Sequence, residues 1–184
     1  MIQRSIELGL KGITFTEHLD PDYPATPDGL DFSLDIPAYR EKLQKLQDTY
    51  RDQIQVRFGI ELGLQMHLGE YFDSLLSQTP FDFVIGSSHL VHGYDPYYPE
   101  FFEGRKEFLC YMEYFESILE NIAVFDGFDV YGHIDYVVRY GPNKNASYSY
   151  QKYADIIDEI LKALIIKGKG IEINTGGFKY GLGH

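Results

Sequence analysis

The sequence predicts an α/β fold built from parallel strands. Two observations support this fold class: short apolar segments typical of buried strands alternate with amphipathic helical segments, and a helix separates most predicted strands from the next. The predicted strands end at intervals typical of repeated supersecondary units, although no segment of the sequence repeats. They end near positions 18, 61, 89, 133 and 174.

The N-terminal part of the chain predicts a helix followed by a strand. Ile2, Ile6 and Leu10 recur every four positions, which predicts a helix over residues 1–10. Residues 13–16 are short and largely apolar, which is typical of a buried strand.

The next unit has a clearer helix signal. Asp35 can cap a helix that contains Pro37 in its first turn. Apolar residues then mark one face at helical spacing. They are Tyr39, Leu43, Leu46 and Tyr50. Residues 54–60 alternate as a strand does, so this unit is expected to end in a second strand.

The rest of the chain predicts three more helices and three more strands. In order they are a short helix over residues 71–76, a strand over 81–85, a long helix over 101–123, a strand over 128–131, a helix over 150–166 and a strand over 171–173. No low-complexity or linker-like segment divides the chain, so residues 1–184 are expected to form one domain.

Composition argues against several functional classes. The chain has 28 acidic and 16 basic residues and a net charge of −12, which is unsuited to binding nucleic acid or an anionic membrane. Its single cysteine, Cys110, excludes an internal disulfide and fits a reducing compartment, so a cytoplasmic location is expected. No apolar run is long enough for a membrane span, and the N-terminus lacks a signal-peptide pattern.

Metal-binding residue types stand at the ends of four consecutive predicted strands. They are His18, Glu61, His89 and His133, although the whole chain has only 6 histidines. Because loops after parallel strands converge on one face, these side chains are expected to lie together. Each residue alone is also compatible with an ordinary polar position, and it is the joint pattern that favours a metal centre.

The residue types also indicate which metals and which chemistry to expect. Imidazole and carboxylate together favour Zn, Mn or Fe over Ca or Mg. Glu61 has two oxygens and can bridge two cations, and two cations about 3.5–4 Å apart can clamp a phosphoryl group. Bound cations would also supply the positive charge that an acidic protein needs to bind a phosphorylated substrate.

Four further residues are candidates with open alternatives. Asp135, a candidate catalytic residue, could hold the imidazole of His133 or a neighbouring ligand, or could cap a helix. Glu17, a candidate substrate-binding residue, could support the ligands or be a polar loop residue. Arg139 could bind a phosphate with two hydrogen bonds or be a solvated or paired arginine. Lys179, in a predicted Gly-rich terminal loop, is a weaker phosphate candidate.

The motifs at the strand ends resemble a known family. Four segments look like successive motifs of the PHP (polymerase and histidinol phosphatase) superfamily, in the right order and over nearly the whole chain. They are residues 9–18, 59–61, 83–89 and 132–135. The continuation to Arg139 and the strand at residues 172–175 resemble the histidinol-phosphate phosphatase branch.

This resemblance implies a fold, a metal site and a reaction. The fold would be a distorted, TIM-like (βα)7 barrel with a trinuclear metal site. Glu61 would bridge two metals, His89 and His133 would bind one of them, and His18 would bind the third. Arg139 would contact the phosphate of a small substrate, L-histidinol phosphate, whose hydrolysis to L-histidinol and phosphate is a step of histidine biosynthesis.

Two motifs of the family are absent from the chain. These are an H-x-H on the opening strand and a D-x-H on the closing strand. The expectation is therefore a partial barrel without its first and last strands, with fewer than three metals and little or no activity. Two alternatives stay open: a PHP phosphoesterase acting on another small phosphate ester or on nucleotide 3′ ends, and an inactive truncated fragment.

Overall fold

The fold is a parallel sheet of five strands with helices. The computed structural model describes residues 1–26 and 29–182. The sheet order is β1-β2-β3-β4-β5, so neighbours in the sheet are also consecutive along the chain. The strands are β1 (Gly12–Leu19), β2 (Gln55–Gly63), β3 (Phe83–Ser87), β4 (Val130–Tyr131) and β5 (Gly170–Ile171). The predicted α/β class is confirmed, and this sequential order is the one that βα barrels use.

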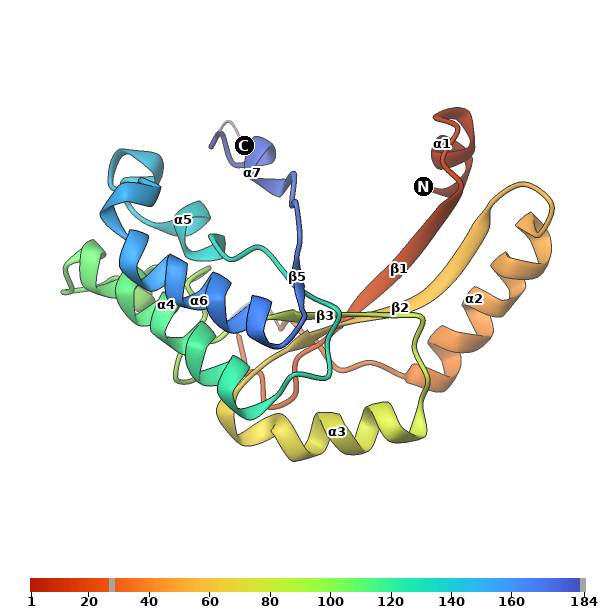
Figure 1. Ribbon diagram of the computed structural model, residues 1–184, viewed down its shortest axis with the longest axis horizontal. Helices are drawn as coiled ribbons and strands as arrows, with labels where there is room; N and C mark the ends of the chain where they lie inside the picture. Colours follow the sequence, from red (N-terminus) through yellow and green to blue (C-terminus); the bar gives the residue numbers. More distant parts are fainter. Residues whose placement is uncertain (27–28, 183–184) are drawn as a thin grey trace.

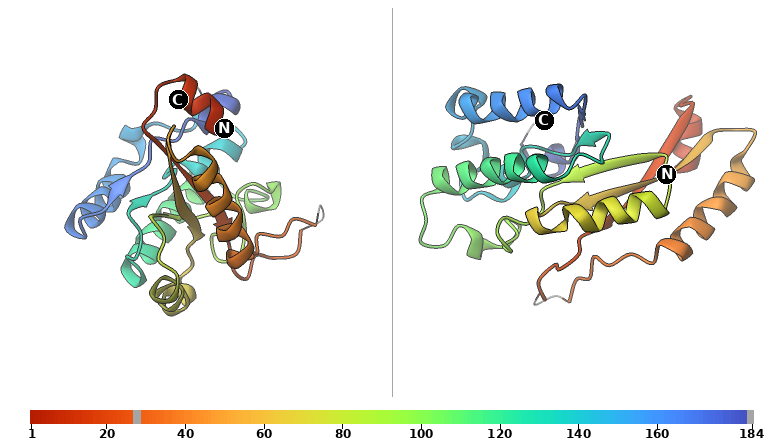
Figure 2. Two further views of the ribbon diagram at one scale, coloured as in Figure 1. Left: turned by 90° about the vertical axis from the view of Figure 1, so that its right-hand side faces the viewer. Right: turned by 60° about the horizontal axis from the view of Figure 1, so that its bottom comes forward.

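The main helices cover one side of the sheet. In Figures 1 and 2, α2, α3, α4 and α6 lie along the outer side of the curved sheet. The short helices α1 and α7 lie near its two edge strands, β1 and β5. The helices are α1 (Ile2–Glu7), α2 (Ile36–Tyr50), α3 (Gly69–Gln78), α4 (Glu107–Val124), α5 (Tyr136–Tyr140), α6 (Ala154–Ile166) and α7 (Gly176–Lys179). Within the described residues, none of them is long and apolar enough to cross a bilayer.

The central strands and their helices form the main hydrophobic core. Ile60 and Leu62 of β2 have no exposed surface, nor do Phe115 and Ile118 of α4. Buried tyrosines fill much of the space beneath α4, among them Tyr114. This core fixes the carboxyl ends of β2 and β3, where two of the four predicted metal ligands, Glu61 and His89, lie.

The start of α2 agrees with its sequence signal. The Asp35 side chain accepts a hydrogen bond from the Ala38 backbone N–H at 2.9 Å. Tyr39, on the predicted apolar face, is buried, and its hydroxyl donates to the carbonyl oxygens of Phe15 (2.8 Å) and Gly59 (2.9 Å). The helix is thereby fixed to both β1 and β2.

Some element boundaries differ from the prediction. The long helix begins at Glu107 rather than near residue 101, because Gly104 adopts a positive φ of 69° and a 3-10 turn occupies Pro99–Phe101. The last strand is shorter than predicted. The predicted Gly-rich terminal loop instead contains α7, so Lys179 lies on a short helix. Helices as short as α5 and α7 depend on tertiary packing, which periodicity does not reveal.

Candidate metal centre

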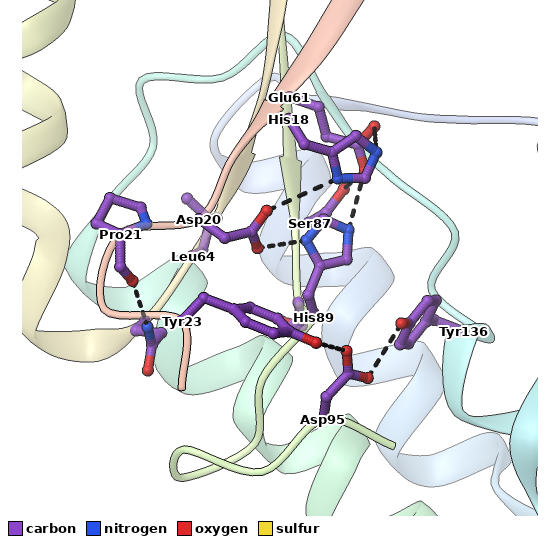
Figure 3. A network of polar contacts seen from close by, with 12 residues as sticks. His18, Asp20, Pro21, Tyr23, Glu61, Leu64, Ser87, His89, Asp95 and Tyr136 are labelled. Carbon is purple, nitrogen blue, oxygen red and sulfur yellow. Dashed lines mark hydrogen bonds and ion pairs between the residues drawn. The ribbon is translucent and has the colours of Figure 1, made fainter. Parts of the chain in front are cut away.

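The four predicted ligands meet at the carboxyl ends of β1 to β4. His18 lies inside β1 and pairs in register with Glu61 of β2. His89 follows β3 and His133 follows β4, each after a short step of backbone. Figure 3 shows His18 and His89 directed toward the Glu61 carboxylate from the two sides of β2, on which Glu61 lies. Residues far apart in the sequence therefore form one cluster.

Glu61 is the centre of this cluster. Its Oε1 lies 3.0 Å from His133 Nε2 and 3.2 Å from His89 Nε2, and its Oε2 lies 3.4 Å from His18 Nε2. The Ser87 hydroxyl donates to Oε1 at 2.8 Å. A single buried carboxylate is thus in contact with three imidazoles.

Asp20 belongs to the cluster and was missed in the sequence. It follows β1 directly and accepts a hydrogen bond from His89 Nδ1 at 2.6 Å, and its other oxygen lies 3.7 Å from His18 Nδ1. Asp20 therefore holds these rings with their Nε2 atoms toward Glu61. The signal was available, because side chains two positions apart on a strand share a face.

Burial and the neighbouring rings shift the pKa values of this cluster. Burial would raise the pKa of Glu61, but hydrogen bonds with His133 and His89 lower it far below its usual range. Burial would likewise raise the pKa of Asp20, yet His89 and His18 lower it to about 2. Burial would lower the pKa of His89, but Asp20 and Glu61 raise it to about 10. The carboxylates and the His89 ring thus favour one another's charged forms.

The cluster fits the binding of a divalent cation. His18, Glu61 and His89 each offer one ligand atom, and these atoms lie within 4.8 Å of one another. The buried Oδ2 of Asp20 and Nδ1 of His133 have no hydrogen-bond partner among the described residues. Buried polar atoms normally have one, so the carboxylate oxygen of Asp20 is suited to a further electrostatic partner. Imidazole and carboxylate are ligands that Zn, Mn and Fe accept.

The cluster forms the floor of a cavity of about 350 Å³. Aromatic side chains make up much of its wall. They are Tyr23, Phe32, Tyr97, Tyr136 and Tyr140. Arg139 and Asn174 also line the cavity, so its surface combines carboxylates, imidazoles, rings and one guanidinium group.

Arg139 is half-buried on α5 and lines this cavity, as expected of a phosphate ligand. Its Cζ lies 5.6 Å from the centre of the Tyr136 ring and 6.0 Å from that of Tyr180. Stacking of this kind fixes a guanidinium group without consuming its hydrogen-bond donors. Its predicted role in substrate binding is compatible with this position.

Asp135 lies apart from the metal cluster. It stands at the N-terminus of α5, where its side chain does not cap the helix, and it lines a neighbouring cavity of about 440 Å³. Among the described residues, Nδ1 of His133 has no hydrogen-bond partner, and its Nε2 contacts Glu61. The predicted role of Asp135 beside the metal ligands stays a prediction.

Glu17 and Lys179 do not line the cavity. Glu17 is exposed and lies next to His18 on β1, so strand alternation directs it to the opposite face of the sheet. Lys179 is exposed on α7, with its Nζ 5.8 Å from the Tyr180 ring centre. Their proposed contacts with substrate stay predictions that this geometry does not favour.

The cavity wall also contains residues with no evident sequence signal. Asp95 is buried in the Tyr/Pro-rich loop after β3 and accepts hydrogen bonds from the hydroxyls of Tyr23 and Tyr136. Its contacts join loops that are far apart in the chain, so no local pattern reveals them.

Comparisons with known proteins agree with this geometry. The chain is 35% identical over 175 residues to the histidinol-phosphatase of Lactococcus lactis subsp. lactis (strain IL1403), covering 95% of this chain and 64% of that relative. It therefore spans less than two thirds of the length of this curated relative.

Solved structures show the same fold. A crystal structure of histidinol phosphate phosphatase from Lactococcus lactis subsp. lactis Il1403, complexed with Zn, L-histidinol and phosphate, has a TM-score of 0.89 at 35% identity, covering 97% of this chain and 66% of that one. A Listeria monocytogenes structure at 17% identity has a TM-score of 0.82, covering 99% and 77%. The family model "PHP domain" matches residues 1–176, and the chain therefore belongs to the PHP domain family.

Proposed function

We propose that this protein is a metal-dependent phosphomonoesterase that hydrolyses L-histidinol phosphate to L-histidinol and phosphate. The observation that carries the proposal is a buried carboxylate, Glu61, in contact with three imidazoles at the floor of a cavity that Arg139 also lines. The similarity to a phosphatase crystallised with Zn, L-histidinol and phosphate supports the same substrate.

The proposed metal ligands are His18, Glu61, His89 and His133, and the proposed cations are Zn, Mn or Fe. When bound, such cations lower the pKa of water and offset the charge of a phosphoryl group. The chain's own contribution is to hold the ligands in place. Asp20 orients His89 through Nδ1, and the Ser87 hydroxyl fixes one oxygen of Glu61.

Arg139 is proposed to bind the phosphate. A guanidinium group can donate two parallel hydrogen bonds to a phosphate, and the rings of Tyr136 and Tyr180 limit its movement. Among the cavity-lining residues that the structure describes, it is the one arginine or lysine. Because of the single cysteine, the cytoplasm is the compartment we propose for this reaction.

The direct test is an assay of metal-dependent hydrolysis. It uses the purified 184-residue chain and any longer form that its gene encodes. L-Histidinol phosphate is compared with other small phosphate esters and with nucleotide 3′ phosphates. Preference for another ester would overturn the substrate assignment while leaving phosphoesterase chemistry intact. Absence of divalent cations from protein purified in their presence would contradict the metal centre itself.

Two variants assign roles to the residues. Glu61→Gln keeps the size of the side chain but removes its charge, and we expect cation affinity to fall by at least about 100-fold. Arg139→Lys keeps the charge but loses the paired donors, so KM is expected to rise by about 10-fold or more. Arg105→Lys is the matched control, since Arg105 pairs with Glu113 away from the cavity.

A further inference from the structure

Asp95 is a buried carboxylate in the cavity wall that the hydrolysis itself does not use. It has 7% of its surface exposed and lines the same cavity as the histidine cluster. Its Oδ1 accepts hydrogen bonds from the Tyr97 backbone N–H at 2.7 Å and from the Tyr136 hydroxyl at 3.1 Å. Its Oδ2 accepts one from the Tyr23 hydroxyl, as Figure 3 shows.

Asp95 differs from the other two carboxylates that line this cavity. Asp20 and Glu61 both contact histidine rings, whereas the hydrogen-bond donors described for Asp95 are neutral hydroxyl and amide groups. Burial raises the pKa of Asp95, while its hydroxyl and amide donors and the electrostatic effect of His89 lower it. A desolvated carboxylate whose direct hydrogen-bond donors are neutral is stabilised when a cation enters beside it.

Aromatic rings surround this carboxylate. The ring centres of Tyr97 and Tyr140 are 5.2 Å apart, and those of Tyr136 and Tyr140 are 5.0 Å apart. The ring of Tyr23 packs against the ring of Phe32, and the two ring centres are 4.6 Å apart. Ring faces attract organic cations, so the wall around Asp95 is suited to an ammonium group.

Tyr136 separates Asp95 from the proposed phosphate site. Its hydroxyl contacts Asp95, while its ring centre lies 5.6 Å from Arg139 Cζ and 5.1 Å from the His133 ring centre. A guanidinium group and an imidazole therefore lie near the ring of Tyr136. A carboxylate lies at the hydroxyl of the same residue. Such an arrangement matches a small ligand with a phosphate and a cationic group.

We propose that Asp95 and the aromatic wall bind the ammonium group of the substrate and so select amino-alcohol phosphates over neutral phosphate esters. This inference rests on the proposed function for the identity of its ligand. The ammonium group is the relevant cation at pH 8, because an unperturbed imidazole has a pKa near 6.5 and is neutral there. Asp95 would be a specificity residue that contacts the part of the substrate that does not react.

Binding to the purified protein at pH 8, measured by titration calorimetry, tests this inference. The probes are L-histidinol and 3-(imidazol-4-yl)propan-1-ol, which lacks only the amine. We expect the protein to prefer L-histidinol by about 10- to 100-fold, the usual effect of a hydrogen bond between charged groups. Asp95→Asn should abolish this preference, and the exposed control Asp22→Asn, on the same loop as Tyr23, should keep it. Equal affinity of the unaltered protein for both probes would overturn the inference without any variant.

A second measurement distinguishes recognition from a purely structural role. The affinity of Asp95→Asn for each probe is compared with that of the unaltered protein. If Asp95 recognises the amine, Asp95→Asn keeps its affinity for 3-(imidazol-4-yl)propan-1-ol and loses affinity only for L-histidinol. If Asp95 only joins the loops through Tyr23 and Tyr136, Asp95→Asn weakens the binding of both probes equally, and the inference is wrong.

The outcome also separates this inference from the proposed function. Binding of L-histidinol through Asp95 without hydrolysis of L-histidinol phosphate would contradict the phosphatase and leave the amine site standing. Hydrolysis of L-histidinol phosphate with no preference for the amine would contradict the amine site alone.

Discussion

The centre and the edges of the sheet hold different parts of the candidate metal site. In β2, Ile60 and Leu62 have no exposed surface, and Glu61 between them is 8% exposed. In the described part of the chain, β1 and β5 each pair on one side only, and the side chain of His18 on β1 is 45% exposed. Three ligands therefore belong to the packed centre, and the fourth belongs to an edge.

This difference indicates how firmly each ligand is held. A strand with neighbours on both sides and a helix layer against it has few alternative positions, so Glu61 is fixed by the core. His18 depends on one neighbouring strand and on Asp20 for its orientation. The centre should therefore supply most of the stability and most of the metal affinity.

The largest expected effect concerns stability. Ile60→Ala at the centre should lower the free energy of unfolding by about 2–5 kcal/mol, because it leaves a cavity in the core. Ile171→Ala on β5, where the side chain is 52% exposed, should cost less than about 1 kcal/mol. Urea unfolding measures both variants, and equal losses would show that β5 is packed as tightly as β2.

The next comparison concerns ligands in the two environments. His133→Ala should weaken divalent cation binding by about 100-fold, and His18→Ala by about 10-fold. The reason is that His133 is buried against Glu61, whereas His18 lies half in solvent at a longer distance. Metal titration with a competing chelator measures both affinities. A greater loss for His18→Ala would place the stronger cation site at the edge.

Gly63→Ala tests the link between centre and edge. A methyl group at Gly63 would lie 1.8 Å from Asp20 Oδ1, so the carboxylate must move and release His89. We expect about a 10-fold loss of cation affinity. Asp20→Ala should have a similar effect, and the double variant should add little to either, because both changes remove the same contact. Additive losses would mean that Gly63 acts by another route.

The smallest effect, and the most specific, is a dependence on pH. Burial would lower the pKa of His89, but its contacts with Asp20 and Glu61 raise it from 6.5 to about 10. The stability that these contacts add to the metal-free protein is thus complete below pH 6.5 and is lost as the pH rises through 10. Asp20 adds stability above pH 4 that is lost as the pH falls toward 2. Thermal unfolding in EDTA should show a decline on the alkaline side that His89→Gln removes and the surface variant His67→Gln keeps.

Metal binding should show the opposite trend on the alkaline side. A bound cation requires neutral His89, so binding releases a proton and tightens as the pH rises. A cation affinity that does not change between pH 7 and 9 would show that His89 is not a ligand.

The sequence by itself predicted the fold class and the four strand-end residues that meet in one cluster. Alternating strand and helix periodicity predicted the parallel sheet, and Asp35 correctly marked the start of α2. His18, Glu61, His89 and His133 could be grouped because parallel strands deliver their carboxyl ends to one edge of a sheet. These are local patterns joined by one rule of topology.

Only the tertiary structure decided how those ligands are supported and what surrounds them. It paired Asp20 with His89 and brought Tyr23 and Tyr136 onto Asp95. These contacts join residues tens of positions apart. Their formation depends on how loops and short helices pack over the sheet, and periodicity along the chain carries no information about that packing.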